Sequence, residues 1–205
     1  MTGPVRRPRG RPRTVDRARA VELAMLECWE HGLSAFSLNE LCKRAGLSKP
    51  ALYREFGGED GLFAAALDHY RQRVSLPLLA RLDTDAGFRP ALDAAIVGLT
   101  TDRDTPAGCL FTKMRLASPR LGPLAAEGVH KLASEHLRAY EAWFCHGVAS
   151  GEANADVPAK LAARYIDTQF ATALVQMGMG VAPALVRAQA RLAVQPLLAE
   201  SRAGP

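Results

Sequence analysis

The stretch SLNELCKRAGLSKPALYREF, residues 37–56, contains two short helix patterns separated by one glycine. Ser37 precedes the first pattern, and Glu40 follows three residues later, which is the arrangement of a capping box. Gly46 ends the first pattern, and Ser48 precedes the second, where Pro50 fits a first helical turn because no intrahelical donor is needed there. Helices of about two turns are marginal alone. These two therefore need neighbouring helices to pack against.

Apolar residues at helical spacing flank this stretch on both sides. We expect helices over residues 16–31, 37–45 and 48–56, and a fourth that begins at Glu59. A tight helix-turn-helix presents its second helix to the major groove of DNA. Ser48 and Lys49 can bond to phosphate or a base edge, whereas Pro50 and Ala51 offer only apolar contact. The pattern alone also fits a helical hairpin that does not bind DNA.

The basic charge of the chain is concentrated at its N-terminus. Five arginines lie within the first 13 residues, and the remainder carries 21 basic and 21 acidic residues. We expect residues 1–13 to form a disordered basic arm of the kind that binds nucleic acid. The segment PRGRP, residues 8–12, resembles an AT-hook, so Arg9, Arg11 and Arg13 are candidates for minor-groove insertion. The alternative is a solvated tail that acts by charge alone.

The stretch from Asp16 to Tyr70 resembles the DNA-binding domain of the tetracycline-repressor (TetR/AcrR) family of bacterial transcriptional regulators. The resemblance rests on SLNEL at residues 37–41, AGLS at 45–48, LYREF at 52–56 and LF at 62–63. It implies an all-α protein with a three-helix DNA-binding domain over residues 14–70 and an effector-binding and dimerisation bundle over residues 71–205. It also implies a sequence-specific regulator, by family default a repressor, that reads a palindromic operator.

The resemblance suggests which residues of the helix-turn-helix contact DNA. Tyr53 matches the tyrosine that bonds a DNA phosphate in the family. With the residues named above, the candidate DNA contacts are Arg9, Arg11, Arg13, Ser37, Ser48, Lys49, Pro50, Ala51, Tyr53 and Arg54. One departure stands out, because the family usually has Lys near the start of its fourth helix, where this chain has Glu59 and then Asp60. Residues 14–70 carry six basic and nine acidic residues, so their net charge is 6 − 9 = −3. We therefore expect DNA binding to depend on the arm.

The rest of the chain reads as helices. The fourth helix is predicted to continue to about residue 81 with a bend at Pro77. Further helices are expected over residues 90–101, 109–117, 121–150, 158–178 and 183–200. The resemblance implies a homodimer through the last two of these, which small residues and leucines suit. No repeat is evident.

The resemblance also implies an effector pocket inside the C-terminal bundle, with an apolar or electrophilic small molecule as its ligand. The candidate effector contacts are Phe88, Cys109, Met114, Trp143, Phe144, Phe170 and Met177, with plain core packing as the alternative for each. His130, His136 and Gln169 are polar groups that can orient a ligand. Cys109 follows a glycine at a predicted helix start, so it is a candidate for attack by electrophiles or oxidants, or otherwise a buried small hydrophobe.

Several classes of function are disfavoured. Because an Arg-rich segment and three glutamates interrupt the early apolar residues, neither a signal peptide nor a membrane span is predicted, and a cytoplasmic protein is expected. The four cysteines lack metal-ligand spacing and are expected to be buried thiols. No metal site, cofactor, nucleophile–base pair or phosphate loop is indicated, so an enzyme is not expected. The rival reading is an architectural protein that binds A·T-rich DNA through the arm alone.

Overall fold

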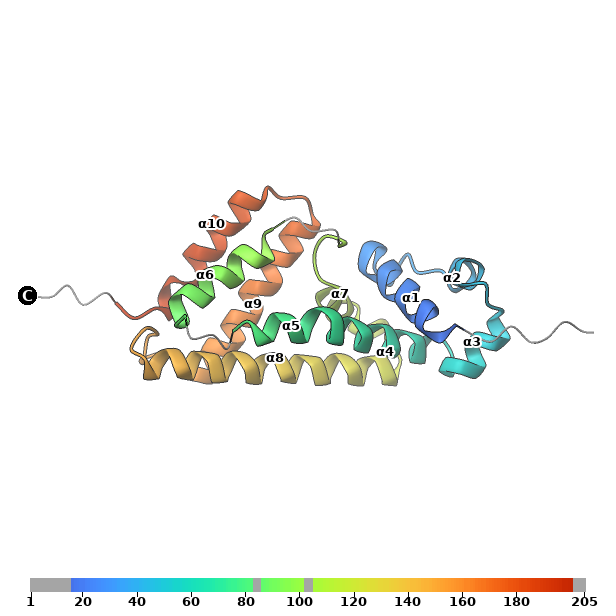
Figure 1. Ribbon diagram of the computed structural model, residues 1–205, viewed down its shortest axis with the longest axis horizontal. Coiled ribbons are helices and arrows are strands. Elements are labelled where there is room, and N and C mark those ends of the chain that lie inside the picture. Colours follow the sequence, from blue (N-terminus) through green and yellow to red (C-terminus); the bar gives the residue numbers. More distant parts are fainter. Residues whose placement is uncertain (1–15, 83–85, 102–104, 201–205) are drawn as a thin grey trace, which may run out of the picture.

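The computed structural model describes residues 16–82, 86–101 and 105–200, and within these ranges the chain is helical without a β-strand. The molecule is elongated, with α2 and α3 at one end and α9 and α10 towards the other (Figure 1). The prediction of an all-α fold with an N-terminal helix-turn-helix is confirmed. Within the described residues, no helix combines the length and apolar character needed to cross a bilayer.

The first three helices are α1 (Arg17–His31), α2 (Leu38–Ala45) and α3 (Lys49–Phe56). Each begins at a side chain that accepts a backbone N–H of the first turn, as an N-cap does. Asp16 accepts from Arg19 at 3.0 Å, Ser37 from Glu40 at 3.4 Å and Ser48 from Ala51 at 3.3 Å. Gly46 adopts the left-handed conformation (φ 65°) between α2 and α3, which is why a glycine stands in this turn.

The fourth helix continues almost to the predicted end, but through a different bend. The helix α4 (Glu59–Tyr70) passes into a π-helical turn (Arg71–Ser75) and then α5 (Leu76–Ala80). The wide turn lies immediately before Pro77, the predicted bend. A proline displaces the carbonyl one turn before it and lacks an N–H, and a π-turn accommodates both effects. The irregularity therefore falls on the turn before the proline.

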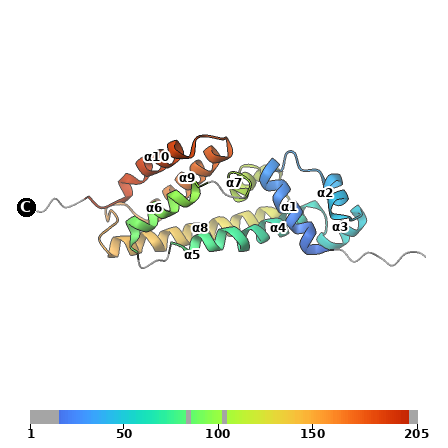
Figure 2. The same ribbon diagram turned by 45° about the horizontal axis from the view of Figure 1, so that its top comes forward.

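The bundle consists of α6 (Phe88–Leu99), α7 (Leu110–Leu116), α8 (Pro123–Ala149), α9 (Ala159–Gly178) and α10 (Pro183–Val194), with a 3₁₀ turn (Ser118–Arg120) before α8. The long helix α8 packs against α4 on one side and α9 on the other, and α10 packs on α9 and α6 (Figure 2). The first four of these helices lie close to their predicted positions, and α10 begins at its predicted residue.

The last helix ends earlier than predicted. α10 stops at Val194 and is followed by a 3₁₀ turn (Gln195–Leu197), where we expected helix to residue 200. Gln195 still has helical dihedral angles, but Pro196 has no N–H with which to continue the α-helical hydrogen bonds. Leu198 then forms an antiparallel bridge with Ala153, in the loop between α8 and α9. This bridge fixes the end of α10 against the loop.

The hydrophobic core does not divide at residue 70. One buried cluster joins α1–α4 to Cys109, Phe111 and Met114 at α7 and to the first half of α8. A second cluster joins α6 and the rest of α8 to α9 and α10. The DNA-binding helices are thus packed directly on the bundle, and the division at residue 70 stays a prediction about function.

Three of the four cysteines are buried, but Cys145 is exposed, which corrects the expectation for that residue. Cys145 lies on α8 between Phe144 and Gly147, which face the core. At 3.6 residues per turn its own side chain points to solvent.

Candidate DNA-binding surface and internal cavity

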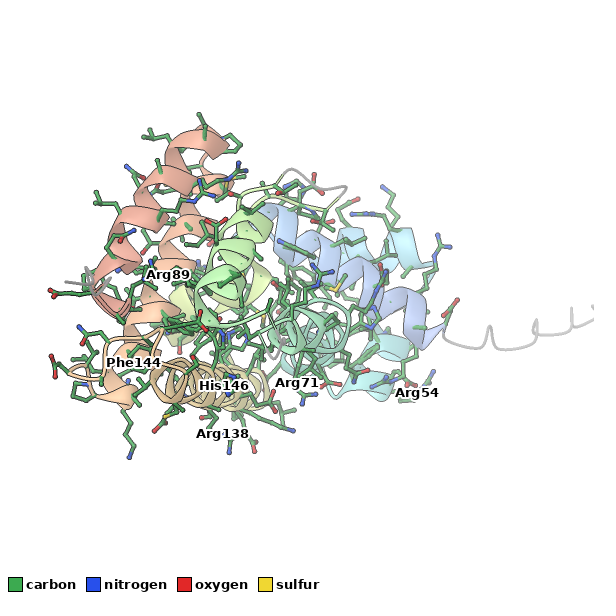
Figure 3. All side chains as sticks on the ribbon, turned by 60° about the vertical axis from the view of Figure 1, so that its left-hand side comes forward. Arg54, Arg71, Arg89, Arg138, Phe144 and His146 are labelled. Atoms are coloured by element: carbon green, nitrogen blue, oxygen red, sulfur yellow. The ribbon has the colours of Figure 1, made fainter. Side chains whose placement is uncertain are left out.

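The outer face of α3 presents the predicted DNA contacts. Lys49, Pro50, Tyr53 and Arg54 are exposed, and Ala51 is half-buried. Figure 3 shows Arg54 at the end of the molecule formed by α3, well separated from Phe144 in the bundle. Leu52 and Phe56, on the opposite face of α3, are buried. The helix is therefore held by its apolar face, and its polar face is open to a partner.

The two predicted serines have local roles. The Ser48 hydroxyl accepts from Ala51 N–H, and the Ser37 hydroxyl accepts from Glu40 N–H. A serine hydroxyl that accepts one bond still has its own proton to donate. Both side chains can thus cap their helix and donate to a phosphate at the same time.

The Tyr53 ring lies against Gly58, where a Cβ would be 3.5 Å from the ring. Gly58 has a φ of +124°, which side-chain-bearing residues rarely adopt. Tyr53 remains 54% exposed. A ring supported from below with an exposed edge is suited to presenting its hydroxyl outward, as the resemblance implied.

Several cations of the helix-turn-helix are already paired. Arg17 pairs with Glu55 at 3.3 Å, Arg44 pairs with Glu27, and Lys43 lies 3.9 Å from Glu40. Lys49 and Arg54, by contrast, have no ion-pair partner among the described residues. Arg19 on α1 is likewise exposed and has no ion pair among the described residues, so two of the three unpaired cations of this part lie on α3. The arm residues Arg9, Arg11 and Arg13 lie outside the described residues.

The two acidic residues at the start of α4, Glu59 and Asp60, have different surroundings. Glu59 is exposed, whereas the Asp60 carboxylate turns towards the bundle and accepts the N–H groups of Leu124 and Ala125, both at 2.9 Å. These are the second and third residues of α8, whose own N-cap, Gly122, has no side chain to offer. Asp60 therefore caps α8 from another helix, which the sequence did not reveal.

A cavity of about 200 Å³ lies inside the bundle, among α5, α6, α7, α8 and α9. Its lining is mainly apolar and includes Leu78, Leu82, Leu99, Phe111, Phe170 and Leu174. Polar side chains gather in the same lining: Tyr70, Ser75, Cys109, Thr112, Arg115, His136, Tyr140 and Asp167. An apolar space with a few convergent polar groups is the usual form of a small-molecule site.

The predicted effector contacts are distributed over different places. Cys109 and Phe170 line the cavity, as does His136. Met177 lines a neighbouring groove beside Trp29, and Trp143 lines a third hollow. The others are core residues outside all three linings: Phe88, Met114 and Phe144. His130 is exposed and Gln169 half-buried, and neither lines the cavity. The assignment of effector contacts itself stays a prediction.

Most polar groups of the cavity are paired with one another. Arg115 donates to Asp167 at 2.8 Å, and a hydrogen bond of 2.6 Å joins the Ser75 hydroxyl to Nε2 of His136. Burial lowers the pKa of His136, so the imidazole is neutral at physiological pH. Ser75, Arg115, Tyr140 and Asp167 are cavity residues that were not predicted from the sequence. The i, i+4 spacing of His136 and Tyr140 was the available signal, but only the packing of α8 shows that this face lines a cavity.

The cavity is joined to the DNA-binding helices by side-chain contacts. The Tyr70 hydroxyl lies 3.1 Å from the Cys109 sulfur, and the Tyr70 ring packs edge-on against Trp29 of α1 with centroids 4.9 Å apart. Trp29 Nε1 donates to the Gly108 carbonyl at 3.3 Å, and Lys113 donates to the carbonyls of Trp29 and Glu30 at the end of α1. These contacts link residues 108–113 directly to α1 and α4.

Comparison with known proteins agrees with this architecture. Residues 21–66 match the model of the bacterial regulatory proteins of the tetR family. The chain is 36% identical over 156 residues to the HTH-type transcriptional repressor ComR of Escherichia coli strain K12, covering 72% of each. It is 33% identical over 121 residues to the repressor BdcR of the same strain, covering 59% of this chain and 56% of BdcR.

Solved structures share the fold. The reduced form of E. coli NemR superposes with a TM-score of 0.77 at 16% identity, over 89% of this chain and 97% of NemR. A cysteine mutant of the TetR family regulator CifR, solved with a 26-bp double-strand operator DNA, superposes with a TM-score of 0.74 at 26% identity, over 92% of this chain and all of CifR.

These features define a helix-turn-helix transcription regulator that binds DNA. The chain belongs to the TetR family of bacterial regulatory proteins. Its relatives are named as transcriptional repressors rather than enzymes, which confirms the expectation that it is not an enzyme.

Proposed function

We propose that the protein is a homodimeric repressor that binds a palindromic operator through α3 and leaves it when a small effector enters the cavity. The proposal that the protein binds DNA through α3 rests on the exposed face of that helix. On this face Lys49 and Arg54 form no ion pair with any described residue. The CifR structure, which contains operator DNA, supports the same use of the fold.

The outer faces of α9 and α10 support a dimer. Leu161, Val175 and Met179 on or next to α9, with Leu185 and Leu192 on α10, are exposed apolar side chains. Small residues among them, such as Ala184 and Ala188, allow close approach between helices. A two-fold dimer places two α3 helices one helical turn apart on DNA.

The cavity supports an apolar or electrophilic effector. Its lining is mainly apolar, and the Cys109 sulfur is part of it. An electrophile with an activated double bond would form a sulfur–carbon bond with Cys109, and the thiol proton would pass to the neighbouring carbon. Either kind of occupant would disturb the contact between Cys109 and Tyr70, and through Trp29 the position of α1. Effector binding thus biases the spacing of the two α3 helices.

The experiment that tests the proposal is the selection of bound genomic DNA fragments by the full chain at fixed salt. A repressor of this design selects fragments that share one palindromic site. In the same assay, Lys49→Ala and Arg54→Ala should weaken binding, whereas Arg44→Ala should have a smaller effect because Arg44 is paired with Glu27.

The second candidate is an architectural protein that uses the basic arm alone, favoured by the five arginines in the first 13 residues. It would select diffuse A·T-rich fragments, and the α3 variants would bind as the unchanged protein does. That result would refute the operator-reading proposal.

A further inference from the structure

The Tyr140 hydroxyl is a buried polar group of the cavity that has no hydrogen-bond partner among the described residues. Tyr140 is 6% exposed, and its ring is held edge-on between His136 and Phe170, with centroids 5.8 and 5.7 Å away. Its hydroxyl has no hydrogen bond to any described residue. Every fully enclosed side-chain nitrogen or oxygen among the described residues does have a partner. The hydroxyl therefore faces open space, which is the cavity that Tyr140 lines.

Most of the surrounding polar groups are engaged with each other. Arg115 binds Asp167, Ser75 binds His136, and Tyr70 contacts Cys109. Burial, with the nearby Asp167 and Cys109, raises the pKa of Tyr140. The phenol thus stays protonated at all physiological pH values and offers one neutral hydrogen-bond donor inside an apolar space.

We propose that the effector is an uncharged, mainly apolar molecule with one hydrogen-bond acceptor, such as a ketone or aldehyde oxygen, and that Tyr140 donates to it. This inference rests on the proposed function, namely that the cavity is the effector site. Tyr140 would then determine specificity, because a ligand without an acceptor leaves a buried donor unpaired.

Charged effectors fit the cavity less well. The charges of Arg115 and Asp167, which are 37% and 12% exposed, compensate each other, and a further charge buried in the cavity without a partner carries a large desolvation cost. Arg81 also lines the cavity, but its side chain is exposed at the rim. An ion pair formed there would remain solvated and contribute little.

The test uses four probes that share a para-fluorophenyl ring and a four-carbon chain: a butyrophenone, a butylbenzene, a 4-phenylbutyrate and a 4-phenylbutylammonium. Titration followed by ¹⁹F NMR gives the dissociation constant of each. The ketone should bind most tightly to the full-length protein. Tyr140→Phe should weaken ketone binding about three- to tenfold and leave butylbenzene unchanged.

Tyr165→Phe is the matched control, because the Tyr165 hydroxyl donates to the Ala193 carbonyl at 2.9 Å and does not line the cavity. It should leave all four affinities unchanged. If Tyr140→Phe does not fold, equal binding of the ketone and butylbenzene to the unchanged protein would still overturn the proposal.

The outcomes separate this inference from the proposed function. Equal binding of the ketone and butylbenzene, or equal losses for both in Tyr140→Phe, would overturn the role of Tyr140 but leave an apolar effector cavity. Tightest binding of the carboxylate would overturn it in favour of Arg81. If none of the probes bound, the cavity would be lost as an effector site as well, and the fragment selection would still test the regulator.

Discussion

Single residues fix how closely the helices of the bundle approach one another. At Gly147 of α8, an added Cβ would lie 2.5 Å from the Phe88 ring, which is fully buried. At Gly128 of the same helix, the nearest atom would be a flexible Leu67 methyl at 3.4 Å. The two glycines thus share a helix but differ in the space around them.

We predict opposite effects when these two glycines are replaced by alanine. Gly128→Ala should raise the free energy of unfolding by about 0.5–1 kcal/mol, since alanine favours helix. Gly147→Ala should lower it by about 1–3 kcal/mol, because Phe88 must move within a packed core. Urea unfolding of both variants measures this. A stabilised Gly147→Ala variant would show that Phe88 has room to shift.

The exposed residues at the start of α3 could largely be predicted from the sequence, whereas the residues that line the cavity could not. Ser48 and Lys49 follow from local patterns, because capping residues and a glycine turn decide where α3 begins, and Tyr53 follows from the family resemblance. Cavity residues are set by the packing of five helices. Phe144 and Tyr140 look equivalent on α8, yet only Tyr140 lines the cavity.

Helix boundaries were also predicted well where local sequence determines them and poorly where distant packing does. Glycine, serine and proline signals located the helices of the DNA-binding part and the bundle within a few residues. The π-turn at residues 71–75 and the early end of α10 were missed, because each depends on how a proline is accommodated by its surroundings. The cap that Asp60 provides for α8 joins residues more than sixty positions apart, so no local pattern reveals it.

That cap leads to a prediction for α8. Asp60→Ala should lower the free energy of unfolding by about 0.5–2 kcal/mol, because two N–H groups at the start of α8 lose their acceptor. Hydrogen exchange at Leu124 and Ala125 should accelerate. Glu59→Ala is the control, since it removes the same charge from an exposed neighbouring position. Identical unfolding curves for the two variants would contradict the capping role.

The contact between the π-turn and α8 makes stability depend on pH. Arg71 donates to both Glu135 carboxylate oxygens, at 2.6 and 3.0 Å, and this bond holds the pKa of Glu135 below its ordinary value of 4.5. Figure 3 shows Arg71 between the α3 end of the molecule and the bundle. The folded state therefore releases the Glu135 proton more readily than the unfolded chain does.

The sign of the pH effect follows from that difference. The contribution of Glu135 is fully present above pH 4.5 and is lost as the pH falls through the lowered pKa. Glu135→Gln should therefore flatten the fall in stability between about pH 5 and 3. Urea unfolding at several pH values measures it, with Glu127→Gln, an exposed site on the same helix, as the control. If stability fell with pH as steeply in Glu135→Gln as in the unchanged protein, the Arg71–Glu135 pair would be excluded as a source of the pH dependence.

At the scale of the whole molecule, dimerisation can be tested with two leucines of equal exposure. Leu192 on α10 and Leu116 on α7 are both 74% exposed, but only Leu192 belongs to the proposed dimer face. Leu192→Glu should raise the dimer dissociation constant at least about thirtyfold, because a buried interface position would receive a charge. Leu116→Glu should leave it unchanged. Sedimentation equilibrium measures the dimer dissociation constant of each variant. Equal changes in the two variants would show that the dimer interface lies elsewhere.

The salt dependence of DNA binding can measure how many phosphate contacts come from the basic arm, residues 1–13, and how many from the helices that follow it. The body of the DNA-binding part is net negative over residues 14–70, and Arg17 and Arg44 are already paired. Each phosphate contact contributes about 0.9 to the slope of log K against log salt. Removing residues 1–13 should therefore weaken operator binding strongly and lower the slope by up to about 4 to 5 per arm, if all five arginines contact phosphate.

The alternative outcomes have distinct meanings. Replacing only Arg9 and Arg11 by alanine should produce part of the change in slope, while Lys49→Ala should lower it by about 1. A truncated protein with an unchanged slope would show that α3 and its neighbours supply all phosphate contacts despite the acidic body. In that case Glu59, at the exposed start of α4, would lie away from the phosphate backbone.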